Sequence, residues 1–160
     1  MRLEQREKEL AAIGASIGAN CRPCIEHHVP AGREAGLTEG ELADAVAAAQ
    51  RIRDQAIDLF AARVEELLGD QGSTSEPELP PATSRERELA ALGASVGANS
   101  HPLIDRHVGA ALEVGLNASE VEAALKMAEY VQQRAAEMTA EAAAHALEER
   151  AGVVTTGAGS

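Results

Sequence analysis

Two cysteines near the start of a predicted helix are the residues best suited to chemistry. Cys21 and Cys24 are the only cysteines in the chain, and they enclose Arg22 and Pro23. A pair at this spacing can close a small disulfide with little backbone movement, and a helix N-terminus favours the thiolate form. The pair therefore indicates redox chemistry.

Two histidines follow the cysteines at helical spacing. His28 is four residues after Cys24 and His27 is three residues after it, so either imidazole could reach the Cys24 sulfur on the same helix face. An adjacent imidazole can take the thiol proton, and the positive charge of Arg22 would further favour the thiolate. We interpret His27 as a solvated surface residue.

The same residues allow two other interpretations. Cys21, Cys24, His28 and Glu9 are a conceivable four-ligand zinc set. Structural zinc sites usually gather a second Cys or His pair, and the sequence supplies none. A purely structural disulfide is the other alternative, but it is uncommon in a cytosolic chain. Thiol chemistry is the preferred interpretation.

The elements that must position these residues belong to a unit that occurs twice. Residues 6–20 recur as residues 85–99, and 21 of the 36 positions from Arg6 to Glu41 are identical at an offset of 79. The segment between the copies, residues 69–81, is rich in Gly, Ser and Pro, and these residues interrupt helices. We predict a first repeat over residues 1–70, a linker over 71–82, a second repeat over 83–150 and a flexible tail over 151–160.

The second copy lacks the thiols but keeps their neighbours. Ser100, Leu103 and Arg106 replace Cys21, Cys24 and His27, whereas Glu9 and His28 recur as Glu88 and His107. This copy cannot perform thiol chemistry. The retained Glu and His either are a relic or serve the fold through a hydrogen bond between the first two helices.

Composition and periodicity predict an all-α protein. The chain has 34 alanines and only two aromatic residues, Phe60 and Tyr130, which favours helices packed closely through small side chains. Such a core stabilises a lone monomer poorly, so we expect an oligomeric helical bundle. Three helices are predicted in the first copy, over about residues 3–18, 21–36 and 39–68, and the last helix of the second copy should reach about Arg150.

Small and capping residues define the ends and contacts of these helices. Gly14 and Gly18 recur as Gly93 and Gly97 and would let another backbone approach closely. Thr38 with Glu41, and Asn117 with Glu120, are predicted capping boxes. Pro30 lies inside the second helix and should kink or loosen it, because proline removes one backbone hydrogen bond.

Charge and hydropathy exclude several partners. Lys and Arg number 14 against 26 Asp and Glu, a formal net charge of −12, which argues against nucleic acid and anionic membranes. No apolar stretch approaches the roughly 20 residues that span a bilayer. Because the N-terminus carries no apolar segment typical of a secretory signal, we expect a cytoplasmic protein.

The chain resembles the carboxymuconolactone decarboxylase superfamily, and specifically its alkylhydroperoxidase D-like branch. The resemblance rests on the spacing Glu9-x11-Cys21-x2-Cys24-x3-His28 and on the surrounding segment Gly14-Ala15-Ser16-x-Gly18-Ala19-Asn20. The resemblance covers about residues 4–60 and, as a degenerate copy, about residues 83–140. It implies an all-helical fold and, for two-copy members, a homotrimer that imitates a hexamer of single-copy chains.

The resemblance also implies a peroxidase cycle that needs no cofactor. Cys24 would attack a hydroperoxide, Cys21 would resolve the product as a disulfide, and Glu9 with His28 would relay protons, before an external dithiol reduces the disulfide. Members of the peroxidase type often carry a histidine between the cysteines, where this chain has Pro23, and the two-copy peroxidases carry the motif in the second copy. A general disulfide carrier, a decarboxylase acting on a lactone acid and a metal-binding protein are therefore alternatives.

Overall fold

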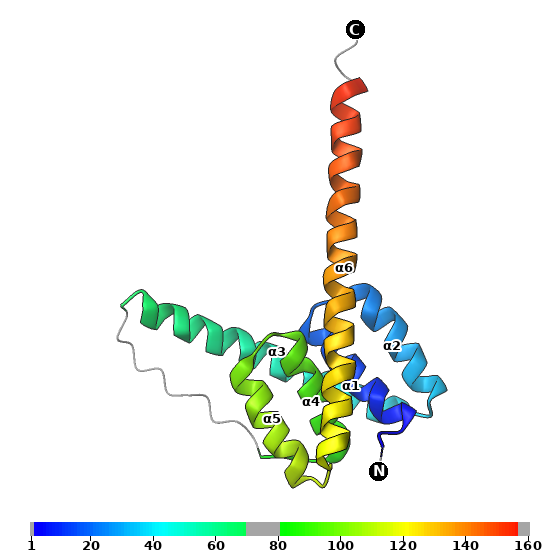
Figure 1. The fold of residues 1–160 in the computed structure, drawn as a ribbon, viewed down its shortest axis with the longest axis vertical. Coiled ribbons are helices and arrows are strands. Elements are labelled where there is room, and N and C mark those ends of the chain that lie inside the picture. The colour runs from blue at the N-terminus through cyan, green and yellow to red at the C-terminus, as the bar shows by residue number, and fades with distance from the viewer. Residues whose placement is uncertain (1, 70–80, 157–160) are drawn as a thin grey trace.

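The computed structural model describes residues 2–69 and 81–156, and every regular element in these ranges is a helix. The six helices are α1 (Gln5–Gly18), α2 (Arg22–Glu34), α3 (Glu39–Leu67), α4 (Arg85–Gly97), α5 (His101–Glu113) and α6 (Ala118–Thr156) (Figure 1). The first three and the last three correspond to the two copies. The predicted all-α fold, made of a three-helix unit that occurs twice, is confirmed.

Capping residues begin the third helix of each copy as predicted. The Thr38 hydroxyl accepts a hydrogen bond from the Glu41 amide at 3.2 Å, and the Glu41 carboxylate accepts one from the Thr38 amide at 2.8 Å. Asn117 and Glu120 repeat this exchange at 3.0 and 2.9 Å. These reciprocal bonds satisfy amides that a helix start leaves without partners.

Helices α1 and α4 form the centre of the molecule, and glycines bring them together. A Cβ added to Gly14 would lie 2.0 Å from the Ala90 carbonyl oxygen, and one added to Gly93 would lie 2.0 Å from that of Ala11. Gly18 and Gly97 make the same reciprocal contacts one turn later. The predicted close approach is confirmed. Because equivalent residues exchange contacts, the copies are related by approximate twofold symmetry. The contacts advance in the same direction along both helices, so α1 and α4 run parallel.

The third helix of each copy packs on the other copy. Ala49 and Ile52 of α3 share a buried cluster with Ala91 and Ala94 of α4 and with Leu103 of α5. In the reciprocal cluster, Ala128, Val131 and Ala135 of α6 pack with Ala12 and Ala15 of α1 and with both cysteines. Each copy therefore completes the core of the other.

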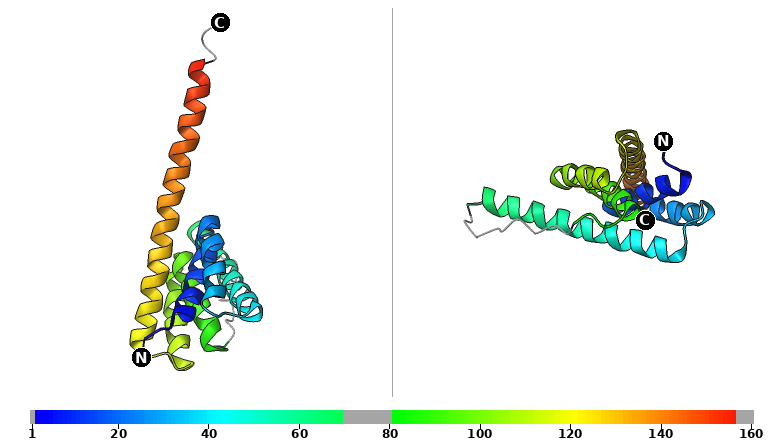
Figure 2. Two further views of the ribbon diagram at one scale, coloured as in Figure 1. Left: turned by 90° about the vertical axis from the view of Figure 1, so that its right-hand side faces the viewer. Right: turned by 90° about the horizontal axis from the view of Figure 1, so that it is seen from below.

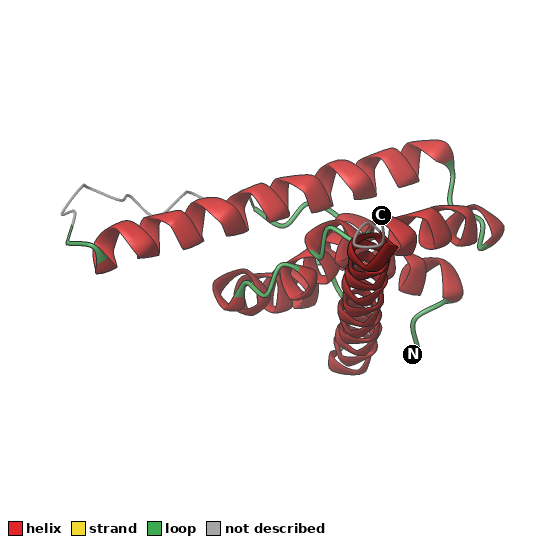
Figure 3. Ribbon diagram, turned by 90° about the horizontal axis from the view of Figure 1, so that it is seen from above, coloured by secondary structure: helices red, strands yellow, loops and turns green. Residues whose placement is uncertain are grey.

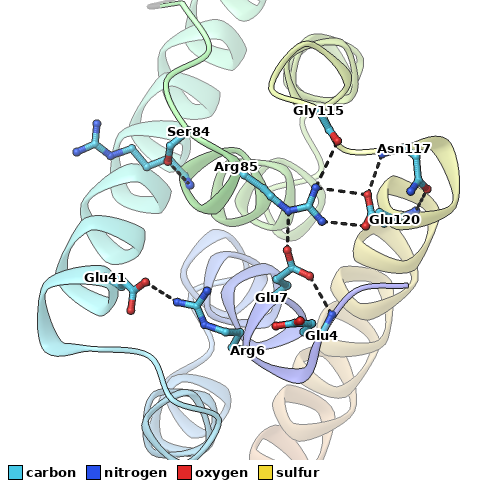
Figure 4. Close-up of polar contacts among 10 residues, drawn as sticks. Glu4, Arg6, Glu7, Glu41, Ser84, Arg85, Gly115, Asn117 and Glu120 are labelled. Carbon is cyan, nitrogen blue, oxygen red and sulfur yellow. Dashed lines mark hydrogen bonds and ion pairs between the residues drawn. The ribbon is translucent and has the colours of Figure 1, made fainter. Parts of the chain in front are cut away.

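Arginines at the starts of α1 and α4 join these elements (Figure 4). Arg6 pairs with Glu41, and its counterpart Arg85 donates to Glu120 at 2.9 Å. Arg85 also donates to Glu7 of the first copy at 2.6 Å. Its guanidinium lies between the two carboxylates in Figure 4 and therefore connects the copies.

The C-terminal halves of α3 and α6 project from the packed core in different directions (Figures 1 and 2). Figure 3 shows α6 end-on while α3 extends far to one side. With 29 and 39 residues, the two helices are about 44 and 58 Å long. Apolar side chains are exposed on both projections, namely Ile57, Phe60, Leu67, Leu68 and Leu147.

The observed helix ends differ from the predicted ones at three places. Helix α1 begins at Gln5 rather than Leu3, and α2, with Pro30 inside it, ends at Glu34 rather than Gly36. Helix α6 continues to Thr156, beyond the predicted end at Arg150, although residues 151–156 contain glycine and β-branched side chains of low helix propensity. Most of the predicted linker and the last four residues of the predicted tail lie outside the described residues.

None of the described helices combines the length and the apolar composition needed to cross a membrane.

Candidate functional site

The two cysteines meet at the start of α2, where they form a disulfide. Their Cα atoms are 5.3 Å apart, and Cys21 occupies the N-cap position. The Cys21 sulfur accepts a hydrogen bond from the Cys24 amide at 3.3 Å. Pro23 fits the first turn of the helix, where a missing amide hydrogen removes no internal bond. The local sequence therefore places both sulfurs at the positive end of the helix dipole.

Both cysteines are buried under the neighbouring helices. Cys21 is 7% exposed and Cys24 is 5% exposed. Alanines of α1 and the α6 residues Val131 and Ala135 surround them, with Met138 partly buried at the edge. Apolar burial disfavours a thiolate, whereas the positive end of the helix dipole favours one. The surroundings also leave little of either sulfur accessible to a large partner.

Glu9 and His28 form a hydrogen-bonded pair between α1 and α2. The Glu9 Oε2 atom lies 2.9 Å from His28 Nδ1, and Gln5 donates to Glu9 Oε1 at 2.6 Å. Burial by itself raises the pKa of Glu9, but the hydrogen bond and positive charge of His28 outweigh this effect, with help from Gln5, and the net pKa is lowered. A carboxylate on Nδ1 orients the imidazole and leaves Nε2 for proton exchange.

The two pairs, Cys21 with Cys24 and Glu9 with His28, are separate in this disulfide state. Among the described residues, no hydrogen bond joins His27 or His28 to either sulfur. His27 is exposed, as predicted, and its ring packs edge-on against His28 with centroids 4.8 Å apart. Arg22 is also exposed, and it donates to Glu26 at 2.8 Å. Its guanidinium is therefore paired with a carboxylate of the same helix in the disulfide form.

The second copy contains the same Glu–His pair without the cysteines. Glu88 Oε2 lies 2.8 Å from His107 Nδ1. The Nε2 atom of His107 is buried without a hydrogen-bond partner, and Leu103 occupies the position of Cys24. The predicted hydrogen bond between the first two helices is thus confirmed in both copies. It forms whether or not thiols are present, so it serves the fold.

The zinc set proposed from the sequence does not assemble in this structure. Within residues 2–69 and 81–156, no group of three or more His, Cys, Asp and Glu side chains is arranged to hold a metal ion. The disulfide occupies both sulfurs of Cys21 and Cys24.

Gln132 of α6 helps to position the helix that covers the cysteines, and the sequence alone did not indicate this role. Its side-chain amide donates to the Val96 carbonyl oxygen at 2.8 Å and to Asn99 Oδ1 at 2.7 Å. These bonds fix α6 over the end of α4, next to the helix face that covers the cysteines. No short-range sequence signal links Gln132 to residues more than 30 positions away.

Comparison with known proteins agrees with the two-copy architecture. The model of the carboxymuconolactone decarboxylase family matches residues 2–64 and 58–146, one match for each copy. No curated protein and no solved structure matches the chain. The family matches cover most of the 160 residues, and they coincide with the repeated helices that hold the cysteines and both Glu–His pairs. The chain therefore belongs to the carboxymuconolactone decarboxylase family.

Proposed function

We propose that the protein is a thiol oxidoreductase of the alkylhydroperoxidase D-like branch, which reduces hydroperoxides through Cys21 and Cys24. The observation that carries the proposal is the disulfide at the N-terminus of α2, followed one helical turn later by an imidazole that a buried carboxylate holds. The family contains both decarboxylases and peroxidases, and the cysteine pair favours the peroxidase chemistry.

In the proposed cycle the reduced Cys24 is the attacking thiol. His28 Nε2 accepts the Cys24 proton, directly or through a water molecule, while Glu9 holds Nδ1. The thiolate attacks the terminal peroxide oxygen, the O–O bond breaks, and the departing alkoxide takes a proton to become an alcohol. Cys24 is thereby oxidised to a sulfenic acid.

Cys21 then resolves the sulfenic acid. Its sulfur attacks the Cys24 sulfur, the S–O bond breaks, water leaves and the disulfide forms. An external dithiol returns two electrons and two protons to regenerate the thiols. The cycle needs no cofactor, and the reducing cytoplasm expected for this chain would supply the dithiol.

Burial favours a hydroperoxide over a protein disulfide as the oxidising substrate. A disulfide carrier must present a sulfur to a partner sulfur, whereas both cysteines here are more than nine-tenths buried. A small hydroperoxide needs only a narrow approach. A decarboxylase, in contrast, would not depend on the thiols at all.

Thiol titration after hydroperoxide treatment tests the proposal. The reduced protein should lose both thiols after one equivalent of hydroperoxide, and mass spectrometry should find the Cys21–Cys24 disulfide. Cys24→Ser should abolish peroxide consumption, whereas Cys21→Ser should allow one turnover and stop at the sulfenic acid. Unchanged consumption by Cys24→Ser would sink the proposal, and reaction with disulfides alone would replace it with the carrier function.

A further inference from the structure

A groove-like cavity lies between α3 of the first copy and the start of α5 in the second copy. Its volume is about 810 Å³, within the range of small-molecule sites. Helix α3 forms one wall with Ala56, Ile57, Leu59 and Phe60, and Pro102 of α5 adds to the apolar lining. Asn20 and Asn99, which follow α1 and α4, line the same cavity. The residues of the proposed thiol cycle are not among its lining.

The charge of this cavity is opposite to that of the whole chain. Two arginines of α3, Arg53 and Arg63, line it, and none of the described lining residues is Asp or Glu, although the chain carries a net charge of −12. Arg53 is half-buried, and its closest carboxylate, Asp54, is 3.8 Å away. Arg63 is exposed and donates to Glu66 at 2.7 Å. Exposed ion pairs of this kind are weak, so an anionic ligand can compete with them.

Comparison of the two copies shows that the α3 part of this lining is not repeated in α6. The scaffold residues Gly18 and Asn20 recur as Gly97 and Asn99. The α3 residues do not recur, because Arg53, Ile57, Phe60 and Arg63 correspond to Gln132, Ala136, Thr139 and Ala142. The cationic and bulky apolar groups are therefore a property of α3 and not of the repeated fold.

We propose that this cavity binds an anionic amphiphile, specifically a long-chain carboxylate. Its carboxylate would bind the half-buried guanidinium of Arg53, which can donate two parallel hydrogen bonds. Its apolar chain would lie along Ile57 and Phe60, which are 59% and 73% exposed without a ligand. Arg63, ten residues further along α3, adds to the positive charge that attracts an anion to the cavity.

Calorimetric titration of the full-length protein with decanoate tests the proposal, and 1-decanol serves as the neutral comparison. Decanoate should bind saturably with one site per chain, below its micellar concentration, and more tightly than decanol. Arg53→Gln introduces the residue of the equivalent position in α6 and should weaken decanoate binding at least tenfold. Phe60→Thr, the corresponding exchange for the apolar wall, should weaken both ligands.

Arg51→Gln is the matched control, because Arg51 lies on the same helix, is exposed and does not line the cavity. It should bind decanoate like the unmodified protein. Three outcomes would each overturn the proposal. The first is equal affinity of Arg53→Gln and Arg51→Gln for decanoate, and the second is binding only above the micellar concentration. The third is a cavity that a second copy occludes, so that no decanoate binds. A Cys21→Ser/Cys24→Ser variant should bind decanoate normally, so this test is independent of the thiol function.

Discussion

His28 and its counterpart His107 both pair with a glutamate through Nδ1, but the surroundings of their Nε2 atoms differ. In each case a glutamate on the preceding helix holds the imidazole, with Oε2 at 2.9 Å from Nδ1 in His28 and at 2.8 Å in His107. His107 leaves Nε2 buried without a partner beside a helix start that carries Leu103 instead of a thiol. The pair thus has a structural role in both copies, and the proposed catalytic role belongs to the first copy alone.

This difference makes Glu9→Gln a sharp test at the residue scale. An amide at position 9 no longer stabilises a protonated His28, so peroxide-driven disulfide formation should slow by roughly tenfold to a hundredfold. Stopped-flow measurement of thiol loss checks the rate.

Glu88→Gln provides the control, because it weakens the equivalent hydrogen bond in the copy that has no thiols. It should lower the melting temperature comparably and leave the rate of thiol oxidation unchanged. Equal slowing by both variants would show that the Glu–His pair acts only through stability.

At the scale of elements, the contact between α1 and α4 depends on the absence of side chains. Gly14→Ala would place a Cβ 2.0 Å from the Ala90 carbonyl oxygen, and a backbone atom cannot move aside as a flexible side chain does. We expect a loss of about 3 kcal/mol or more of unfolding free energy, measured by chemical denaturation.

Gly109→Ala is the opposite case on α5. A Cβ at Gly109 meets nothing within 4 Å, so alanine should stabilise the helix by about 0.5–1 kcal/mol. Similar destabilisation by both substitutions would contradict the close packing of α1 against α4.

The ion pairs at the helix starts predict an acid-sensitive fold. The pKa of Glu120 is lowered by Arg85 and then by the Asn117 amide, and the pKa of Glu41 is lowered by the Thr38 amide and then by Arg6. A carboxyl whose pKa is lowered by folding stabilises the protein above its unfolded pKa. That contribution is lost as the pH falls through the folded pKa. The melting temperature should therefore decrease as the pH falls below about 4.5.

Glu41→Gln/Glu120→Gln should lower the melting temperature at pH 7 and reduce its further decrease in acid. Glu148→Gln, on the exposed C-terminal part of α6, should change neither. Thermal denaturation followed by circular dichroism measures the melting temperature across this pH range. If the melting temperature of the double variant depends on pH as that of the unmodified protein does, Glu41 and Glu120 do not cause the acid sensitivity.

At the scale of the whole molecule, both projecting helices leave apolar side chains without partners. Leu67, Leu68 and Leu147 are 70%, 81% and 71% exposed, and such surfaces are typical of association sites. We propose a homotrimer, as the family resemblance implies. Its mass would be about 50 kDa, three times the chain mass of 16.6 kDa.

Analytical ultracentrifugation tests this assembly. The unmodified protein should sediment as a trimer, and Leu67→Lys/Leu68→Lys should dissociate it by placing charges in the interface. Gln50 is exposed on the part of α3 that packs against the other helices and does not project from them. Gln50→Lys should therefore leave the trimer intact. A monomer at micromolar concentration would contradict the proposal.

The sequence by itself determined the features that depend on near neighbours. Helix formation follows from alanine content, capping boxes join residues three positions apart, and the Cys21–Cys24 pair spans a single turn. The repeat also exposed which residues the two copies share, including the glycines that proved to join α1 to α4.

Only the tertiary structure decided which faces meet. Several alanine-rich helix faces are equally suitable for burial, so periodicity does not say that α6 covers the cysteines while α3 covers Leu103. The link from Arg85 to Glu7 and the cavity along α3 likewise join residues far apart in the chain. These contacts form between the two copies, so their energy is gained only when helices of both copies have come together.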